Sequence, residues 1–132
     1  MHTTLLKAAL VIFGLAFLLI YPLAIVWPSG WAWHMGAPYS NDYYMMIVAV
    51  YAVLGVFLIL AARNPDANRS LIWFTVWSSL LHGLVMAQQS FGMTDGMNHM
   101  GHLMGDVPAL ILVAIVLGGL MLMRDRPATA TS

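Results

Sequence analysis

The sequence predicts an all-α integral membrane protein, folded as a four-helix up-down bundle with both termini in the cytoplasm. Composition, four long apolar runs and a one-sided distribution of basic residues predict this class. Of the 132 residues, 61% are hydrophobic and 8% are charged, whereas a typical soluble domain has about 25% charged residues. We therefore expect the hydrophobic segments to contact a lipid bilayer instead of forming a core surrounded by water.

Four apolar runs define the expected helices of a single domain that covers residues 1–132. They lie at residues 5–26, 43–62, 70–90 and 106–123. Each approaches the length of about 20 residues that an α-helix needs to cross a hydrocarbon layer of about 30 Å. Backbone groups in lipid must be hydrogen-bonded within their own segment, so all four runs are expected to be helical.

The first run resembles a signal peptide in one respect, because a single basic residue, Lys7, lies near its start. Its apolar part is longer than the about 7–15 residues of a signal-peptide hydrophobic region, and no clear cleavage site follows. We therefore expect it to be a membrane helix. Pro22, near its outer end, predicts a kink in the last turns.

The other helices have recognisable ends. Residues 40–42 (Ser-Asn-Asp) supply an N-cap for the second helix, and residues 64–65 (Asn-Pro) end it. Residues 105–108 (Gly-Asp-Val-Pro) predict a similar start for the fourth helix, with the aspartate as its cap. The connections are short, which favours antiparallel packing of consecutive helices.

The basic residues predict the orientation. An alternating four-helix path places all of them on one side, which the positive-inside rule assigns to the cytoplasm. They are Lys7, Arg63, Arg69, Arg124 and Arg126. Residues 27–42 and 89–106 then form the outer loops, and six aromatic residues around the first of them are expected to form an interfacial belt. These are Trp27, Trp31, Trp33, Tyr39, Tyr43 and Tyr44.

Charge and cysteine content exclude several classes of function. The formal net charge is zero and the chain has no basic patch, so no nucleic acid is expected as a partner. The absence of cysteine excludes disulfides, thiolate metal sites and thiol catalysis. No nucleotide-binding loop or Ser-His-Asp set is present.

The third helix carries a polar stripe. At 3.6 residues per turn, spacings of three, four and seven place six residues on one face. These are Thr75, Ser78, Ser79, His82, Met86 and Gln89. His82 lies about 18 Å along the helix from residue 70 at about 1.5 Å per residue, in the outer half of the membrane. An ionisable residue there indicates a functional site, although a hydrogen bond that only joins two helices is the alternative.

The second outer loop is rich in the side chains that bind soft metals. Residues 93–104 contain four methionines and two histidines: Met93, Met97, His99, Met100, His102 and Met104. Imidazole and thioether ligands suit copper, and imidazole also suits zinc. His102 and Asp106 are four apart and share a face if their segment is helical. The alternative is a solvated loop in which Asp106 serves only as a helix cap.

The sequence therefore predicts an outward-facing polar pocket that binds copper or zinc, or the polar head of a cofactor or of a lipid-soluble substrate. The expected metal ligands are His82, His99, His102 and Asp106, and the expected cofactor contacts are Ser78, Ser79, Met86 and Gln89.

Two other classes of function remain open. One is a non-catalytic accessory or scaffold subunit of a larger membrane complex. Its helix contacts with a membrane-protein partner or a second copy would use Gly55 and residues 118–119. The other is a membrane enzyme with His82 and Asp106 as acid and base.

Four segments resemble a family of small bacterial four-helix membrane proteins of unknown function. They are WPSGWAW, YYMMIVAVYAVLGVFLILAARNP, RSLIWFTVWSSLLHGLVMAQQ and HLMGDVPAL. The resemblance spans most of residues 5–123 and implies a four-helix fold and a multi-pass location in the bacterial inner membrane. It implies no activity. The positions that match the family's motif are His82, Met86, Gln89, His102 and Asp106.

Overall fold

The computed structural model describes residues 1–33, 36–92 and 99–126, except for the side chain of His99. The predicted all-α class is confirmed, because every regular element within these ranges is a helix. In chain order the elements are α1 (His2–Leu18), α2 (Ile20–Val26), α3 (Pro28–Trp31), η1 (Pro38–Ser40), α4 (Asp42–Ala61), η2 (Asp66–Asn68), α5 (Arg69–Gly92), η3 (His99–Leu103) and α6 (Asp106–Asp125).

The second, third and fourth predicted helices are α4, α5 and α6, with ends displaced by no more than two residues. The predicted cap of α4 is also present, because Asn41 Oδ1 accepts a hydrogen bond from the backbone N–H of Tyr44 at 2.8 Å. The cap predicted for the fourth helix is wrong. Gly105 is the N-cap of α6, and Asp106 is its first helical residue. The carboxylate of Asp106 binds other partners, described below.

The first apolar run is not one helix. It is divided at Leu19 into α1 and α2, which are bent by 55°. The predicted kink at Pro22 is therefore confirmed, and its cause is the missing N–H, which cannot donate to the carbonyl four residues earlier. The turn before the bend tightens, because the Leu19 N–H is shared between the carbonyls of Leu15 and Ala16, both at 3.1 Å.

Within the described residues, three helical stretches are long and apolar enough to cross a membrane: Asp42–Ala61, Asp66–Gly92 and Met100–Asp125. The bent pair of α1 and α2 would make a fourth if it counts as one span. Length and composition are therefore compatible with a membrane protein of three or four spans.

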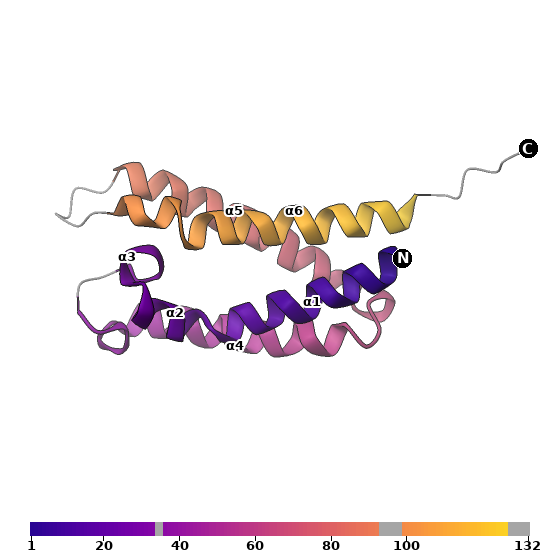
Figure 1. Ribbon diagram of the computed structural model, residues 1–132, viewed down its shortest axis with the longest axis horizontal. Helices are drawn as coiled ribbons and strands as arrows, with labels where there is room; N and C mark the ends of the chain where they lie inside the picture. Colours follow the sequence, from indigo (N-terminus) through magenta and orange to yellow (C-terminus); the bar gives the residue numbers. More distant parts are fainter. Residues whose placement is uncertain (34–35, 93–98, 127–132) are drawn as a thin grey trace, which may run out of the picture.

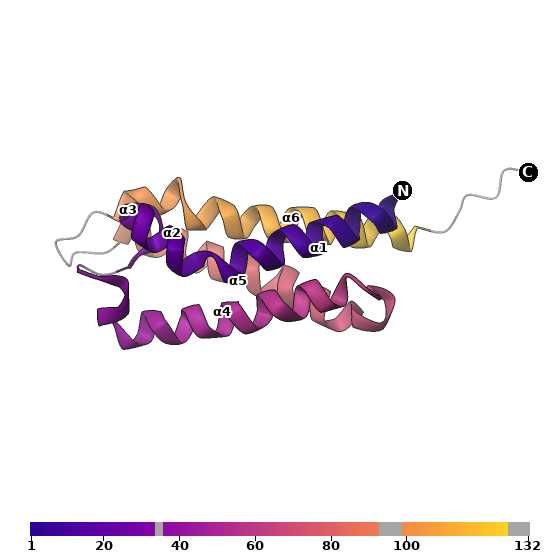
Figure 2. The same ribbon diagram turned by 60° about the horizontal axis from the view of Figure 1, so that its bottom comes forward.

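The helices form two pairs, which lie one above the other in Figure 1. α1 packs along α4, α5 packs along α6, and the two pairs meet mainly through α1 and α6. Consecutive helices were expected to pack against each other, but α4 and α5 are nearly out of contact although only a short turn joins them. Figure 2 shows the separation of α4 from α6 from a second direction. The start of α1, the end of α6 and the α4–α5 turn lie at the same end of the molecule (Figure 1).

Small residues explain this pairing. At the crossing of α1 and α4, Gly14 and Gly55 lie so close that a Cβ on Gly55 would come 2.5 Å from the carbonyl oxygen of Gly14. Between α5 and α6, a Cβ on Gly118 would lie 3.3 Å from Val76. The buried face of α4 thus packs against α1, and the buried face of α5 packs against α6. Little helix surface is left for a contact between α4 and α5.

The tightly packed core lies toward the end that holds the termini. Its largest fully buried apolar side chains are Leu6, Leu10, Leu58, Ile72, Leu117 and Met121. Leu10 is at the middle of α1, and each of the others lies in the half of its helix nearer the start of α1, the end of α6 or the α4–α5 turn. The bundle is therefore closed at this end, and any space between the two helix pairs must lie toward the outer loops.

Substitution of Gly55 by alanine is expected to destabilise the fold by about 1–3 kcal/mol, because the new methyl group overpacks a backbone contact. Gly119→Ala is the matched control, since a Cβ there meets nothing within 4 Å and alanine in an open helix position gains about 0.5–1 kcal/mol. Thermal unfolding in detergent, followed by circular dichroism, measures both. Equal shifts for the two variants would contradict the close α1–α4 crossing.

Candidate functional site

A cavity of about 600 Å³ lies between the two helix pairs, in the half of the molecule toward the outer loops. Its volume falls in the range of about 300–1,000 Å³ that is usual for small-molecule sites. Most of its wall is apolar and comes from α1, α2 and α6. The residues of the wall that carry a polar group are Trp31, Trp33, Asn41, Tyr43, Tyr44, Tyr51, His82, Gln89 and Asp106.

His82 and Tyr51 form a polar bridge across the gap between α4 and α5. The Tyr51 hydroxyl lies 2.5 Å from His82 Nδ1, and the two rings are 5.7 Å apart between centroids. Phe17 of α1 holds the tyrosine ring from another side in an edge-on contact at 4.9 Å. Because α4 and α5 otherwise barely touch, this hydrogen bond is their principal polar link.

The direction of the hydrogen bond in this bridge decides which nitrogen of neutral His82 carries the proton. A neutral imidazole has one nitrogen that donates and one that accepts. If the Tyr51 O–H donates to Nδ1, the proton of neutral His82 is on Nε2. His82 lies on the cavity wall, and Nε2 has no hydrogen-bond partner among the described residues. A cavity ligand with a carbonyl or hydroxyl oxygen therefore has a donor to meet there.

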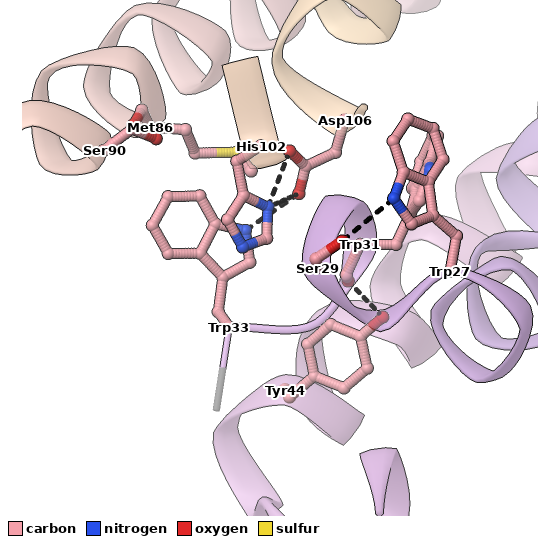
Figure 3. A network of polar contacts seen from close by, with 9 residues as sticks. All are labelled: Trp27, Ser29, Trp31, Trp33, Tyr44, Met86, Ser90, His102 and Asp106. Carbon is pink, nitrogen blue, oxygen red and sulfur yellow. Dashed lines mark hydrogen bonds and ion pairs between the residues drawn. The ribbon is translucent and has the colours of Figure 1, made fainter. Parts of the chain in front are cut away.

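A second polar cluster, formed by Trp33, His102 and Asp106, lies at the outer end of the same cavity (Figure 3). His102 Nδ1 lies 3.0 Å from both carboxylate oxygens of Asp106. Trp33 Nε1 donates to Asp106 Oδ2 at 2.8 Å, and the indole stacks on the imidazole with centroids 3.9 Å apart. The predicted pairing of residues 102 and 106 is present, with a tryptophan added to it.

The cluster is buried, so its polar groups need hydrogen-bond partners within the protein. His102 is 1% exposed and Asp106 is 7% exposed. A buried carboxylate is tolerated when donors surround it, and here imidazole and indole both approach its oxygens. Asp106 also lies in the first turn of α6, where the helix dipole favours negative charge.

The short helix α3 brings Trp33 to this position. A Cβ on Gly105 would lie 2.4 Å from the carbonyl oxygen of Gly30, and a Cβ on Gly101 would lie 2.4 Å from that of Ser29. Only glycine allows the backbone of α3 to lie this close to η3 and the start of α6. The Tyr44 hydroxyl anchors the segment from below by donating to the Trp31 carbonyl at 2.8 Å (Figure 3).

Only some residues of the predicted polar stripe of α5 lie at the cavity. Met86 and Gln89 line the cavity with His82, whereas Ser78 and Ser79 are not among its lining residues. Ser78 donates to the carbonyl of Thr75 at 3.4 Å, and the hydroxyl of Ser79 is buried with no partner among the described residues. Only part of the predicted set of cofactor contacts therefore meets the cavity.

The structure does not bring the described members of the predicted metal-ligand set together in one group. His82 and Asp106 share the cavity wall, while His102 is held against Asp106. Within residues 1–33, 36–92 and 99–126, no group of three or more histidine and acidic side chains is placed to hold a metal ion. The side chain of His99 lies outside the described residues, as do Met93 and Met97. A copper or zinc site remains a prediction.

Tyr51 and Trp33 are the site residues that the sequence analysis missed. Tyr51 lies nine residues from the outer start of α4, and His82 lies ten residues from the outer end of α5. These nearly equal distances along antiparallel helices were the signal in the sequence for a contact between the two residues. The sequence places Trp33 in the predicted aromatic belt. Tyr39 and Tyr43 are largely exposed, as a belt requires, but Trp33 and Tyr44 turn inward.

Comparison with known proteins gives one match. No curated protein and no solved structure matches the chain. A protein-family model described as "Family of unknown function (DUF6632)" matches residues 2–129. That match covers nearly the whole chain and confirms the resemblance to an uncharacterised family. The chain belongs to the family of unknown function DUF6632.

Proposed function

We propose that this chain is a multi-pass protein of the bacterial inner membrane that holds a lipid-soluble ligand, head group inward, between its two helix pairs. The observation that carries the proposal is the cavity of about 600 Å³, whose apolar wall is interrupted by the Tyr51–His82 bridge and by Asp106. Ligand sites are typically apolar pockets with a few convergent polar groups.

The wall suggests how such a ligand would lie. Its apolar part would pack along α1, where Phe13 and Phe17 line the cavity. Its head group would meet the donor of His82 and the polar groups near Asp106. The cavity reaches the surface at Ile12 and Ile47, which line it and are 62% and 45% exposed. A ligand would therefore enter sideways, from the lipid.

The proposed topology has four spans, with α1 and α2 as one bent span and both termini in the cytoplasm. It is supported by the position of the start of α1, the end of α6 and the α4–α5 turn at one end of the molecule (Figure 1). All five basic residues belong to that end by sequence position, as the positive-inside rule requires of a cytoplasmic side. The cavity then lies in the outer half of the membrane.

The test extracts lipid-soluble molecules that remain bound to the purified full-length chain and quantifies them by mass spectrometry. Tyr51→Phe removes the partner that orients His82, and it is expected to retain about tenfold less ligand, as if one hydrogen bond of about 1.4 kcal/mol between His82 and the ligand were lost. Ala16→Phe, which fills the cavity from α1, is expected to retain almost none.

Ala49→Phe is the control, because Ala49 is exposed on α4 and is not a cavity residue. The proposal fails if the wild type and Ala16→Phe release the same molecules in the same amounts. Elemental analysis of the same samples tests the metal form of the proposal. One bound copper or zinc ion per chain, lost in His82→Ala, would support a metal as the ligand.

A further inference from the structure

A groove of about 590 Å³ lies at the opposite end of the molecule, between the start of α1 and the end of α4. Its floor is apolar and includes Ala8 and Val11 of α1 and Ile59 of α4. Two basic residues, Lys7 and Arg63, are part of its wall. The groove thus combines apolar surface with cationic groups.

These two cations have no acidic partner among the described residues, in contrast to Arg69 and Arg124. Arg69 forms a two-point ion pair with Asp125, with N–O distances of 2.9 and 2.6 Å, and Arg124 binds Asp66 at 2.6 Å. Among the described residues, neither Lys7 nor Arg63 forms an ion pair, and the other described acids, at positions 42 and 106, start helices at the far end.

We infer that this groove is a binding site for an anionic phospholipid, whose phosphate lies between Lys7 and Arg63 and whose acyl chain lies on the floor of the groove. The charge of the head group complements the two unpaired cations. A free phosphate would use the cations and leave the apolar floor uncovered, whereas a phospholipid covers both. The position also fits, because this is the end proposed to face the cytoplasmic head groups.

The experiment reconstitutes the full-length chain in nanodiscs and measures lipid retention by native mass spectrometry. The probes are phosphatidylglycerol, phosphatidylcholine and inorganic phosphate. Phosphatidylglycerol is expected to be retained in preference to phosphatidylcholine. Lys7→Gln and Arg63→Gln are each expected to weaken its retention about fivefold, and the double variant about 25-fold, if each cation near the surface contributes as basic residues usually do.

Two further variants separate this site from general surface charge. Arg126→Gln removes one exposed cation from the same end but outside the groove, and it is expected to leave retention unchanged. Ala8→Phe keeps every charge and fills the groove, and it is expected to abolish the preference for phosphatidylglycerol. The inference is overturned if Arg126→Gln costs as much as Lys7→Gln, or if inorganic phosphate competes with the lipid at equal concentration. Either result leaves the outer cavity untouched.

Discussion

Asp106→Ala is expected to destabilise the protein by about 2–6 kcal/mol, because two buried donors lose their acceptor at about 1–3 kcal/mol each. The substitution removes the acceptor that serves both the His102 imidazole and the Trp33 indole N–H. Both donors would then remain in a site where His102 is 1% exposed, and each unsatisfied buried donor costs about 1–3 kcal/mol. The measurement is thermal unfolding in detergent, followed by circular dichroism and tryptophan fluorescence.

Asp42→Ala provides the control for this result. Asp42 is the first residue of α4, as Asp106 is the first residue of α6, so both have the same favourable position relative to a helix dipole. Asp42 is exposed, and its loss is expected to cost only about 0.3–1 kcal/mol. If the two variants lose the same stability, Asp106 acts through the helix dipole alone, and the contacts with Trp33 and His102 contribute nothing.

Local sequence features predicted the parts of this fold that depend on local physics. Apolar runs predicted three helices to within two residues at each end, because apolar composition and backbone hydrogen bonding act on each segment separately. Pro22 predicted the bend and Asn41 predicted a cap. The pairing of His102 with Asp106 followed from their i, i+4 spacing.

The sequence did not reveal which elements meet, since partner choice depends on surfaces far apart in the chain. The contact of Tyr51 with His82 requires α4 and α5 to lie near each other without packing, and this spacing depends on the glycines at the α1–α4 and α5–α6 contacts. The sequence makes Gly55 a candidate for contacts with a partner protein. It is instead occupied inside the chain, against Gly14, and only Gly119 of the expected contact glycines meets nothing within 4 Å.

The double variant Gly101→Ala/Gly105→Ala is expected to lose about 2–6 kcal/mol, as two overpacking costs of about 1–3 kcal/mol each. The three atoms nearest to a Cβ on Gly105 are all backbone atoms of Gly30, at 2.4, 2.8 and 2.9 Å. No flexible side chain can move aside to relieve such a contact. The helix α3 must therefore shift, and Trp33, two residues beyond its end, shifts with it.

This displacement predicts coupling with the first variant. If α3 positions Trp33, the glycine double variant has already weakened the indole contact with Asp106, so adding Asp106→Ala should cost less than it does in the wild type. Gly92→Ala is the control, because it lies at the same end and a Cβ there meets nothing within 4 Å. It should change stability little and leave the cost of Asp106→Ala intact. If the stability costs of the glycine double variant and of Asp106→Ala simply add, Trp33 contacts Asp106 without help from α3. The close glycine contacts would then support packing alone, and the wall of the outer cavity would be independent of them.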